Sequence, residues 1–114
     1  MNYDSKLREL LNFTIQEKAS DLHISVGHPP TLRITGRLIP LTKFKPITAR
    51  DSQELAFELM TDEQKERFLQ KKEIDFSYNF EGRARFRINI FFQSGTISCA
   101  LRLIPSKIPT LEEG

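Results

Sequence analysis

Three arginines near the start of the last third of the sequence, and a fourth that follows them, could together bind an anion. Arg83, Arg85 and Arg87 occupy alternate positions, so on a β-strand their side chains would project from one face. Arg102 follows after a Ser94-Gly95 pair that is typical of a turn. A hairpin that turns at this pair places Arg87 directly opposite Arg102, with their Cβ atoms about 5 Å apart.

Two guanidinium groups that face each other repel, so an anion or a carboxylate is expected between or beside them. One interpretation is structural: Glu73, Asp75 or Glu81 neutralises the pair. The other is an anion clamp, because the planar guanidinium never loses its charge and matches phosphate oxygens with two parallel hydrogen bonds. The sequence leaves both interpretations open.

Two other groups of residues could do chemistry, and both favour a structural interpretation. Asp21 and His23 lie two residues apart on one face of an expected strand, and His28 follows in a turn. Without a Cys or Glu at ligand spacing, we predict structural hydrogen bonds for the pair and no metal site. Cys99 has no catalytic partner in view and is predicted to lie in the core.

The elements of the first half follow from apolar spacing. Apolar residues three and four positions apart predict a helix over 7–15, capped by Asp4 or Ser5. Alternation of polar and apolar residues predicts short strands over 20–25 and 31–35. A third short strand, over 38–41, contains a proline, which limits it to the edge of a sheet.

The second half predicts two helices and then a meander of strands. A helix is expected over 48–60, and the capping-box spacing of Thr61 and Gln64 starts another, which should carry Phe68 and Leu69 inward. Strands are expected over 74–80, 83–91 and 96–104. This order predicts an α+β fold of PAS-like proportions, a mostly antiparallel sheet with helices packed on one face.

Composition favours one small intracellular domain that carries no complete catalytic site. The 114 residues suffice for one core, and the net charge of +2 is too balanced to indicate nucleic acid or an anionic membrane. The single cysteine fits a reducing compartment, and no apolar run reaches the roughly 20 residues that span a bilayer. We therefore expect a cytoplasmic protein. No G-x-x-x-x-G-K-[ST] loop is present, so the chain is not expected to act as an enzyme alone.

Three stretches together resemble the N-terminal domain of PilT-type (PilT/PilU) ATPases, which retract type IV pili and belong to the secretion ATPase superfamily. Residues 19–38 contain S-D-L-H, then G-x-P-P, then R-x-x-G. Residues 75–77 are followed by the R-F-R-I-N of 85–89, and the third stretch is R-L-I-P-S-K over 102–107. The combination spans nearly the whole chain.

The resemblance implies a PAS-like domain over residues 1–105 and, over 106–114, the start of a linker to a RecA-like core that carries the phosphate loop. In such a parent, a homohexamer would use ATP and Mg²⁺ to drive pilus retraction and twitching motility. Arg87 and Arg102 would be arginine fingers on the nucleotide phosphates, with Arg85 in support. The implied partners are RecA-like domains of the same and neighbouring subunits and the pilus-base proteins of the inner membrane.

Two other functions remain open from the sequence. A free-standing PAS-like domain would be a sensor that binds a small molecule in a cavity of its core, or an interaction domain. A nucleic-acid module would use the Arg83, Arg85 and Arg87 face together with Phe91 and Phe92, although Phe86 and Ile88 fall on the opposite face of that strand. We therefore expect no nucleic-acid partner. Because no apolar run is long enough to span a bilayer, we also expect no direct membrane insertion.

Overall fold

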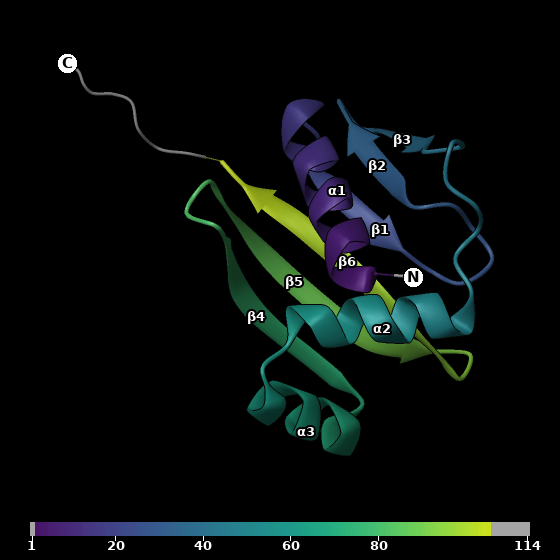
Figure 1. The fold of residues 1–114 in the computed structure, drawn as a ribbon, viewed down its shortest axis with the longest axis vertical. Coiled ribbons are helices and arrows are strands. Elements are labelled where there is room, and N and C mark those ends of the chain that lie inside the picture. The colour runs from purple at the N-terminus through teal and green to yellow at the C-terminus, as the bar shows by residue number, and fades with distance from the viewer. Residues whose placement is uncertain (1, 106–114) are drawn as a thin grey trace.

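The centre of the fold is a six-stranded sheet in the order β3-β2-β1-β6-β5-β4, in which every pair of neighbours is antiparallel. The computed structural model describes residues 2–105 (Figure 1). The strands run as β1 Asp21–Ile24, β2 Thr31–Ile34, β3 Arg37–Pro40, β4 Glu73–Phe80, β5 Ala84–Gln93 and β6 Thr96–Ile104. The predicted α+β class and antiparallel sheet are confirmed, and the proline-containing β3 is an edge strand as expected.

Three helices lie on one face of this sheet, as predicted. They are α1 Tyr3–Gln16, α2 Ala49–Leu59 and α3 Asp62–Lys71. Helices α1 and α2 cover the middle of the sheet, and α3 lies below the β4 end (Figure 1). None of these helices is long and apolar enough to cross a membrane.

The helix starts follow local side-chain chemistry. Thr61 and Gln64 form the predicted capping box of α3, and Thr48 with Asp51 forms another at α2. The expected cap of α1 was wrong: its N-cap is Asn2, whose side-chain oxygen accepts a hydrogen bond from the Ser5 backbone. Asn and Asp are about equally good caps, so the sequence pattern did not separate them.

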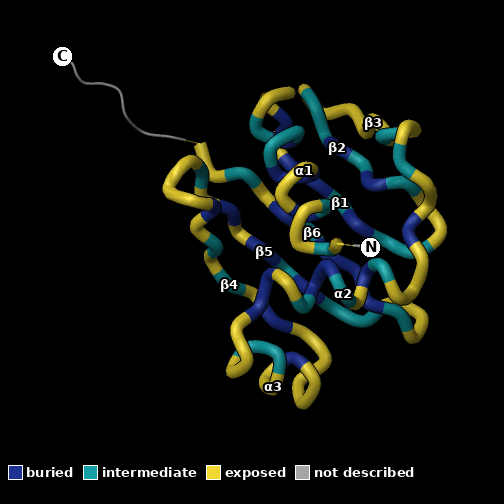
Figure 2. Tube along the Cα trace, in the orientation of Figure 1, coloured by how far each residue is buried: buried dark blue, intermediate teal, exposed yellow. Residues whose placement is uncertain are grey.

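Alternation along the central strands divides core from solvent. In β5, Phe86, Ile88 and Ile90 are fully buried, whereas Arg85 and Arg87, which alternate with them, are exposed. Figure 2 shows the alternation of buried and exposed positions along the central strands. Burial of large apolar side chains on this one face provides the main favourable free energy of folding. Within residues 2–105 no helix covers the opposite face of the sheet (Figure 1), and we call it the open face.

Two expectations about individual residues were wrong. Leu69 does not point inward: it is 48% exposed, and Phe68 is the buried residue of α3. Arg83 does not lie on the strand with Arg85 and Arg87, because β5 begins at Ala84. Arg83 belongs to the preceding turn, and its guanidinium donates a hydrogen bond to Asn12 of α1 instead.

Asp51 joins the start of α2 to the start of α1. Its carboxylate accepts hydrogen bonds from the Thr48 backbone at 3.0 Å and from the Tyr3 hydroxyl at 2.9 Å. Burial raises the pKa of Asp51, but these hydrogen bonds outweigh burial, and the pKa lies below its usual value. The ionised carboxylate is therefore favoured by folding.

We expect the Asp51→Asn variant to be less stable than the parent chain at neutral pH. Because the pKa of Asp51 is lower in the folded chain, the ionised carboxylate stabilises the parent chain, and this stabilisation is fully present above about pH 4, near the ordinary pKa of Asp. It disappears as the pH falls through the lowered pKa. Urea unfolding from pH 7 to pH 2.5 would measure the convergence of the two stabilities. Glu66→Gln, at an exposed position of α3, is the control, and a gap that persisted at the lowest pH would contradict the prediction.

Candidate functional site

A row of charged residues crosses the open face at right angles to the strands. Strand register places Arg33 of β2 beside Asp21 of β1, Asp21 beside Arg102 of β6, and Arg102 beside Arg87 of β5. Neighbouring strands lie about 4.8 Å apart, so the four side chains form one continuous line. We call this set the charged row.

The predicted pairing of Arg87 with Arg102 is confirmed. The two residues are direct partners in the β5–β6 hairpin, which turns at Ser94 and Gly95. Both backbone positions of this turn have positive φ, which glycine tolerates readily. Arg87 and Arg102 side chains are 62% and 71% exposed, so both guanidinium groups are accessible from the open face.

Each of these arginines is held by a carboxylate from its outer neighbouring strand. Asp75 of β4 accepts the Arg87 Nε hydrogen at 2.7 Å, and Asp21 of β1 accepts the Arg102 Nε hydrogen at 3.1 Å. The two guanidinium groups are thereby drawn toward opposite edges of the sheet, which relieves their repulsion. The structural interpretation and the anion interpretation are therefore compatible. The carboxylates occupy Nε of both arginines and Nη2 of Arg87, while Nη1 of Arg87 and both Nη atoms of Arg102 have no hydrogen-bond partner within residues 2–105.

The expectation that Glu73, Asp75 or Glu81 pairs with the arginines is confirmed through Asp75. Asp75 binds Arg87 as expected. Glu73 instead accepts a hydrogen bond from Asn89, and Glu81 pairs with Arg8 of α1. The partner of Arg102 is Asp21, which the sequence pattern paired only with His23. Alternation predicted that Asp21 lies on a strand, but no local pattern predicted that this strand pairs with β6.

Arg85, predicted to support the arginine pair, lies on the same open face. It stands opposite Asn79 of β4 and Ile104 of β6. Among residues 2–105 it has no ion-pair partner, and it lines a shallow cavity of about 580 Å³ at the end of the sheet. Its charge is therefore available on this face.

Asp21 and His23 only partly follow the structural prediction. Asp21 is 7% exposed and accepts hydrogen bonds from Ser20 and Arg102. The Nε2 atom of His23 is buried and has no hydrogen-bond partner within the described part of the chain. Within residues 2–105, no group of three or more His, Cys, Asp or Glu side chains gathers in a geometry that could hold a metal ion.

Cys99 lies in the core, as predicted, and is 2% exposed. Burial raises the pKa of its thiol to about 12, so almost no thiolate exists at neutral pH. We expect Cys99 in the folded chain to resist a thiol-specific disulfide reagent at pH 8 and to react promptly after unfolding in urea, as followed by absorbance. Prompt reaction of the folded chain would contradict this assignment and would reopen a reactive role.

Comparison with known proteins places this fold beside pilus motor ATPases. The chain is 38% identical over 107 residues to the type IV pilus retraction ATPase PilT of Pseudomonas aeruginosa. The matched region covers 94% of the chain and 31% of PilT. It is 33% identical over 108 residues to the type IV pilus ATPase PilU of the same organism, covering 95% of the chain and 28% of PilU. No protein-family model matches the chain.

Solved structures of two ATPases share this fold. A crystal structure of the pilus retraction motor PilT with bound ADP superimposes with a TM-score of 0.81 at 36% identity, covering 90% of this chain and 30% of that one. The ATPase DotB of Legionella pneumophila superimposes with a TM-score of 0.76 at 25% identity, covering 94% of this chain and 31% of DotB. The chain thus spans about 30% of the length of these relatives.

Proposed function

We propose that this chain, which is homologous to PilT and PilU and has the fold of the N-terminal domain of PilT, completes the nucleotide site of a pilus-retracting ATPase. It would act together with a RecA-like domain that binds ATP and Mg²⁺. Arg87 and Arg102 would contact the nucleotide phosphates as arginine fingers. Arg85 would add positive charge beside them.

The observation that carries the proposal is the register of β5 and β6. It presents two permanently charged guanidinium groups side by side on an exposed face. In phosphoryl transfer, negative charge spreads over the oxygens of the transferred group, and a positioned arginine lowers the barrier by stabilising that charge. The existing carboxylate partners do not prevent this role, because both arginines remain largely exposed.

The assembly follows from the same proposal. The parent would be a homohexamer in the cytoplasm, bound to proteins of the pilus base at the inner membrane, and it would power twitching motility. The open face would meet RecA-like domains of the same and neighbouring subunits. The PilT structure with bound ADP supports the nucleotide as a ligand of the parent.

The other two functions gain no support from the structure. Cavities of about 270 to 580 Å³ at the surface of residues 2–105 are lined by residues other than the central core residues Phe86, Ile88 and Leu101, so they lend no support to a sensor that binds a small molecule in its core. A nucleic-acid module would use Phe91 and Phe92 together, but the Phe92 ring stacks on Phe68 of α3 with a centroid separation of 5.0 Å.

A hybrid protein tests the proposal. In it, this chain replaces the segment of P. aeruginosa PilT with which it aligns, so that PilT supplies the rest of the ATPase. The hybrid should hydrolyse ATP at a rate comparable with that of PilT, and the doubly substituted hybrid with Arg87→Ala and Arg102→Ala should not. A folded hybrid without activity, or a doubly substituted hybrid with full activity, would contradict the proposal.

A further inference from the structure

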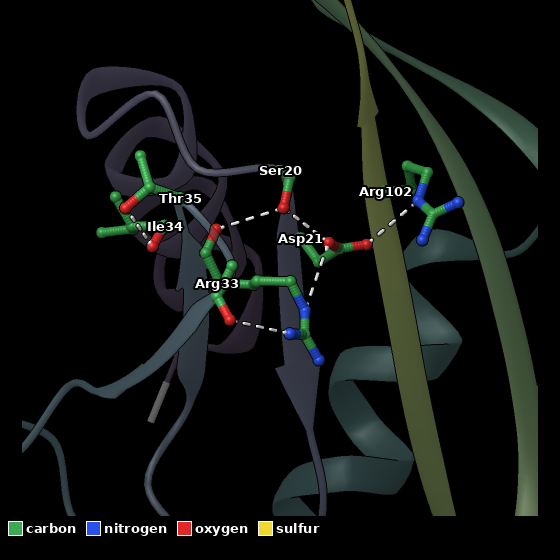
Figure 3. A network of polar contacts seen from close by, with 7 residues as sticks. Ser20, Asp21, Arg33, Ile34, Thr35 and Arg102 are labelled. Atoms are coloured by element: carbon green, nitrogen blue, oxygen red, sulfur yellow. Dashed lines mark hydrogen bonds and ion pairs between the residues drawn. The ribbon is translucent and has the colours of Figure 1, made fainter.

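Asp21 is the most constrained member of the charged row. Its Oδ2 accepts a hydrogen bond from the Ser20 hydroxyl at 2.7 Å and lies 3.8 Å from Arg33 Nε, while its Oδ1 accepts from Arg102 Nε at 3.1 Å (Figure 3). Arg33 is in turn tied to the Gly36 carbonyl at 3.2 Å. Ser20, which directly precedes β1, and Arg33 of β2 therefore hold the Asp21 carboxylate independently of its contact with Arg102.

The ionised form of Asp21 is favoured in this setting. Burial raises the pKa of Asp21, but hydrogen bonds from Ser20 and Arg102 outweigh burial and hold the pKa below its usual value. The carboxylate is consequently charged at neutral pH. It presents a permanent, buried anchor to the base of the Arg102 guanidinium.

Asp21 holds Arg102 at one point only. Nε is the guanidinium nitrogen nearest the backbone, and within residues 2–105 the two terminal Nη atoms of Arg102 have no hydrogen-bond partner. The side chain is 71% exposed although its anchor is buried. A contact at Nε restricts the orientation of the guanidinium plane and leaves the outer pair of N–H groups available for a bidentate contact with an anion.

Asp75 binds Arg87 differently. It accepts from both Nε at 2.7 Å and Nη2 at 3.4 Å, and its own side chain is 49% exposed. This contact occupies one outer nitrogen of Arg87, so an anion that approaches in bidentate fashion has to compete with Asp75. An exposed ion pair of this kind contributes little free energy, and it can be displaced.

We infer that Asp21 is a positioning residue that orients Arg102 toward the nucleotide phosphate, whereas Asp75 competes with the phosphate for Arg87. This inference rests on the proposed function, since it assigns a role to Asp21 only if Arg102 acts on phosphate. The two carboxylates thus provide a matched pair: both bind an arginine of the same face, yet their removal should have different effects.

The contact itself can be tested on the 114-residue chain without any nucleotide. In a ¹⁵N-edited NMR spectrum of arginine Nε–H groups, Asp21→Asn should shift the Arg102 signal and leave the Arg87 signal in place. Asp75→Asn should do the reverse. An Arg102 signal that is unchanged in Asp21→Asn would overturn the inference, whatever the role of Arg102 in catalysis.

The positioning role is tested by steady-state kinetics of the hybrid ATPase. We expect Asp21→Asn to lower kcat by about 10- to 100-fold, the range for a displaced catalytic group, with a smaller effect on KM. Asp75→Asn should leave kcat undiminished. In a hybrid that already carries Arg102→Ala, Asp21→Asn should cause no further loss, because the residue that it positions is gone.

The outcomes separate the inference from the proposed function. A loss that persists in the Arg102→Ala background would show that Asp21 acts only on the fold, and it would overturn the positioning role. Full activity of Arg102→Ala alone would instead refute the arginine finger, while the NMR contact would stand. If Asp21→Asn fails to fold, Ser20→Ala removes one anchor of Asp21 from an exposed position and should lower kcat in the same direction.

Discussion

Replacing Arg102 by alanine should lower the ATP turnover of the hybrid by at least about 100- to 1000-fold, the range seen when one hydrogen-bond donor leaves an oxyanion site. The fold should survive, because the Arg102 side chain is 71% exposed and the neighbouring core residue Leu101 is unaffected. Phosphate release under saturating ATP measures the effect. Circular dichroism confirms that the domain is intact.

The matched control for this prediction is Arg37→Ala. Arg37 is also basic and exposed, but it lies on the edge strand β3, where its register partner is Ile34 of β2, away from the charged row. The Arg37→Ala variant should retain turnover within about twofold.

Arg87→Ala should resemble Arg102→Ala, and the double variant should lose less than the product of the two effects, since both residues would act on one phosphoryl group. Unchanged turnover in Arg102→Ala would remove the arginine-finger assignment.

Phe68→Ala should destabilise the 114-residue chain by about 3–5 kcal/mol, the usual cost of truncating a fully buried phenylalanine. Phe68 is the buried residue of α3, and its ring stacks nearly parallel on Phe92 of β5, at an interplanar angle of 4°. It therefore provides the main apolar contact of α3 with the sheet. Because small domains are stable by only about 5–15 kcal/mol, this loss would be a large share of the total. Urea unfolding at 25 °C measures it.

Leu69→Ala is the control for the core prediction. Leu69 is the next residue of the same helix, but it is 48% exposed, so its truncation should change the free energy of unfolding by no more than about 0.5 kcal/mol. A cost for Leu69→Ala equal to that of Phe68→Ala would mean that α3 packs differently from this structure. The two variants thus test the orientation of α3 about its own axis.

Local sequence patterns were sufficient wherever the physical cause was itself local. The β5–β6 hairpin is closed by a turn at Ser94 and Gly95, and counting outward from a turn gives the register that pairs Arg87 with Arg102. The capping box at Thr61 likewise depends on residues three positions apart. Alternation identified the buried face of β5 because side chains of a strand point to opposite faces in turn.

Local patterns failed where several neighbours were equivalent by spacing. Phe68 and Leu69 are both apolar and adjacent, and only the position of β5 decides which of them is buried. Arg83 continues the alternation of Arg85 and Arg87 in the sequence. The structure nevertheless begins the strand one residue later, and Arg83 instead bonds to Asn12, which is 71 residues away in the chain.

The charged row therefore has two origins. The opposition of Arg87 and Arg102 follows from local sequence, because the two residues share one hairpin. The contact of Asp21 with Arg102 comes from long-range packing, since the two lie 81 residues apart and meet through the pairing of β1 with β6. That pairing depends on the helices and strands packing together into one sheet, and the free energy of burying the common core, rather than any motif around Asp21, brings the carboxylate to the arginine.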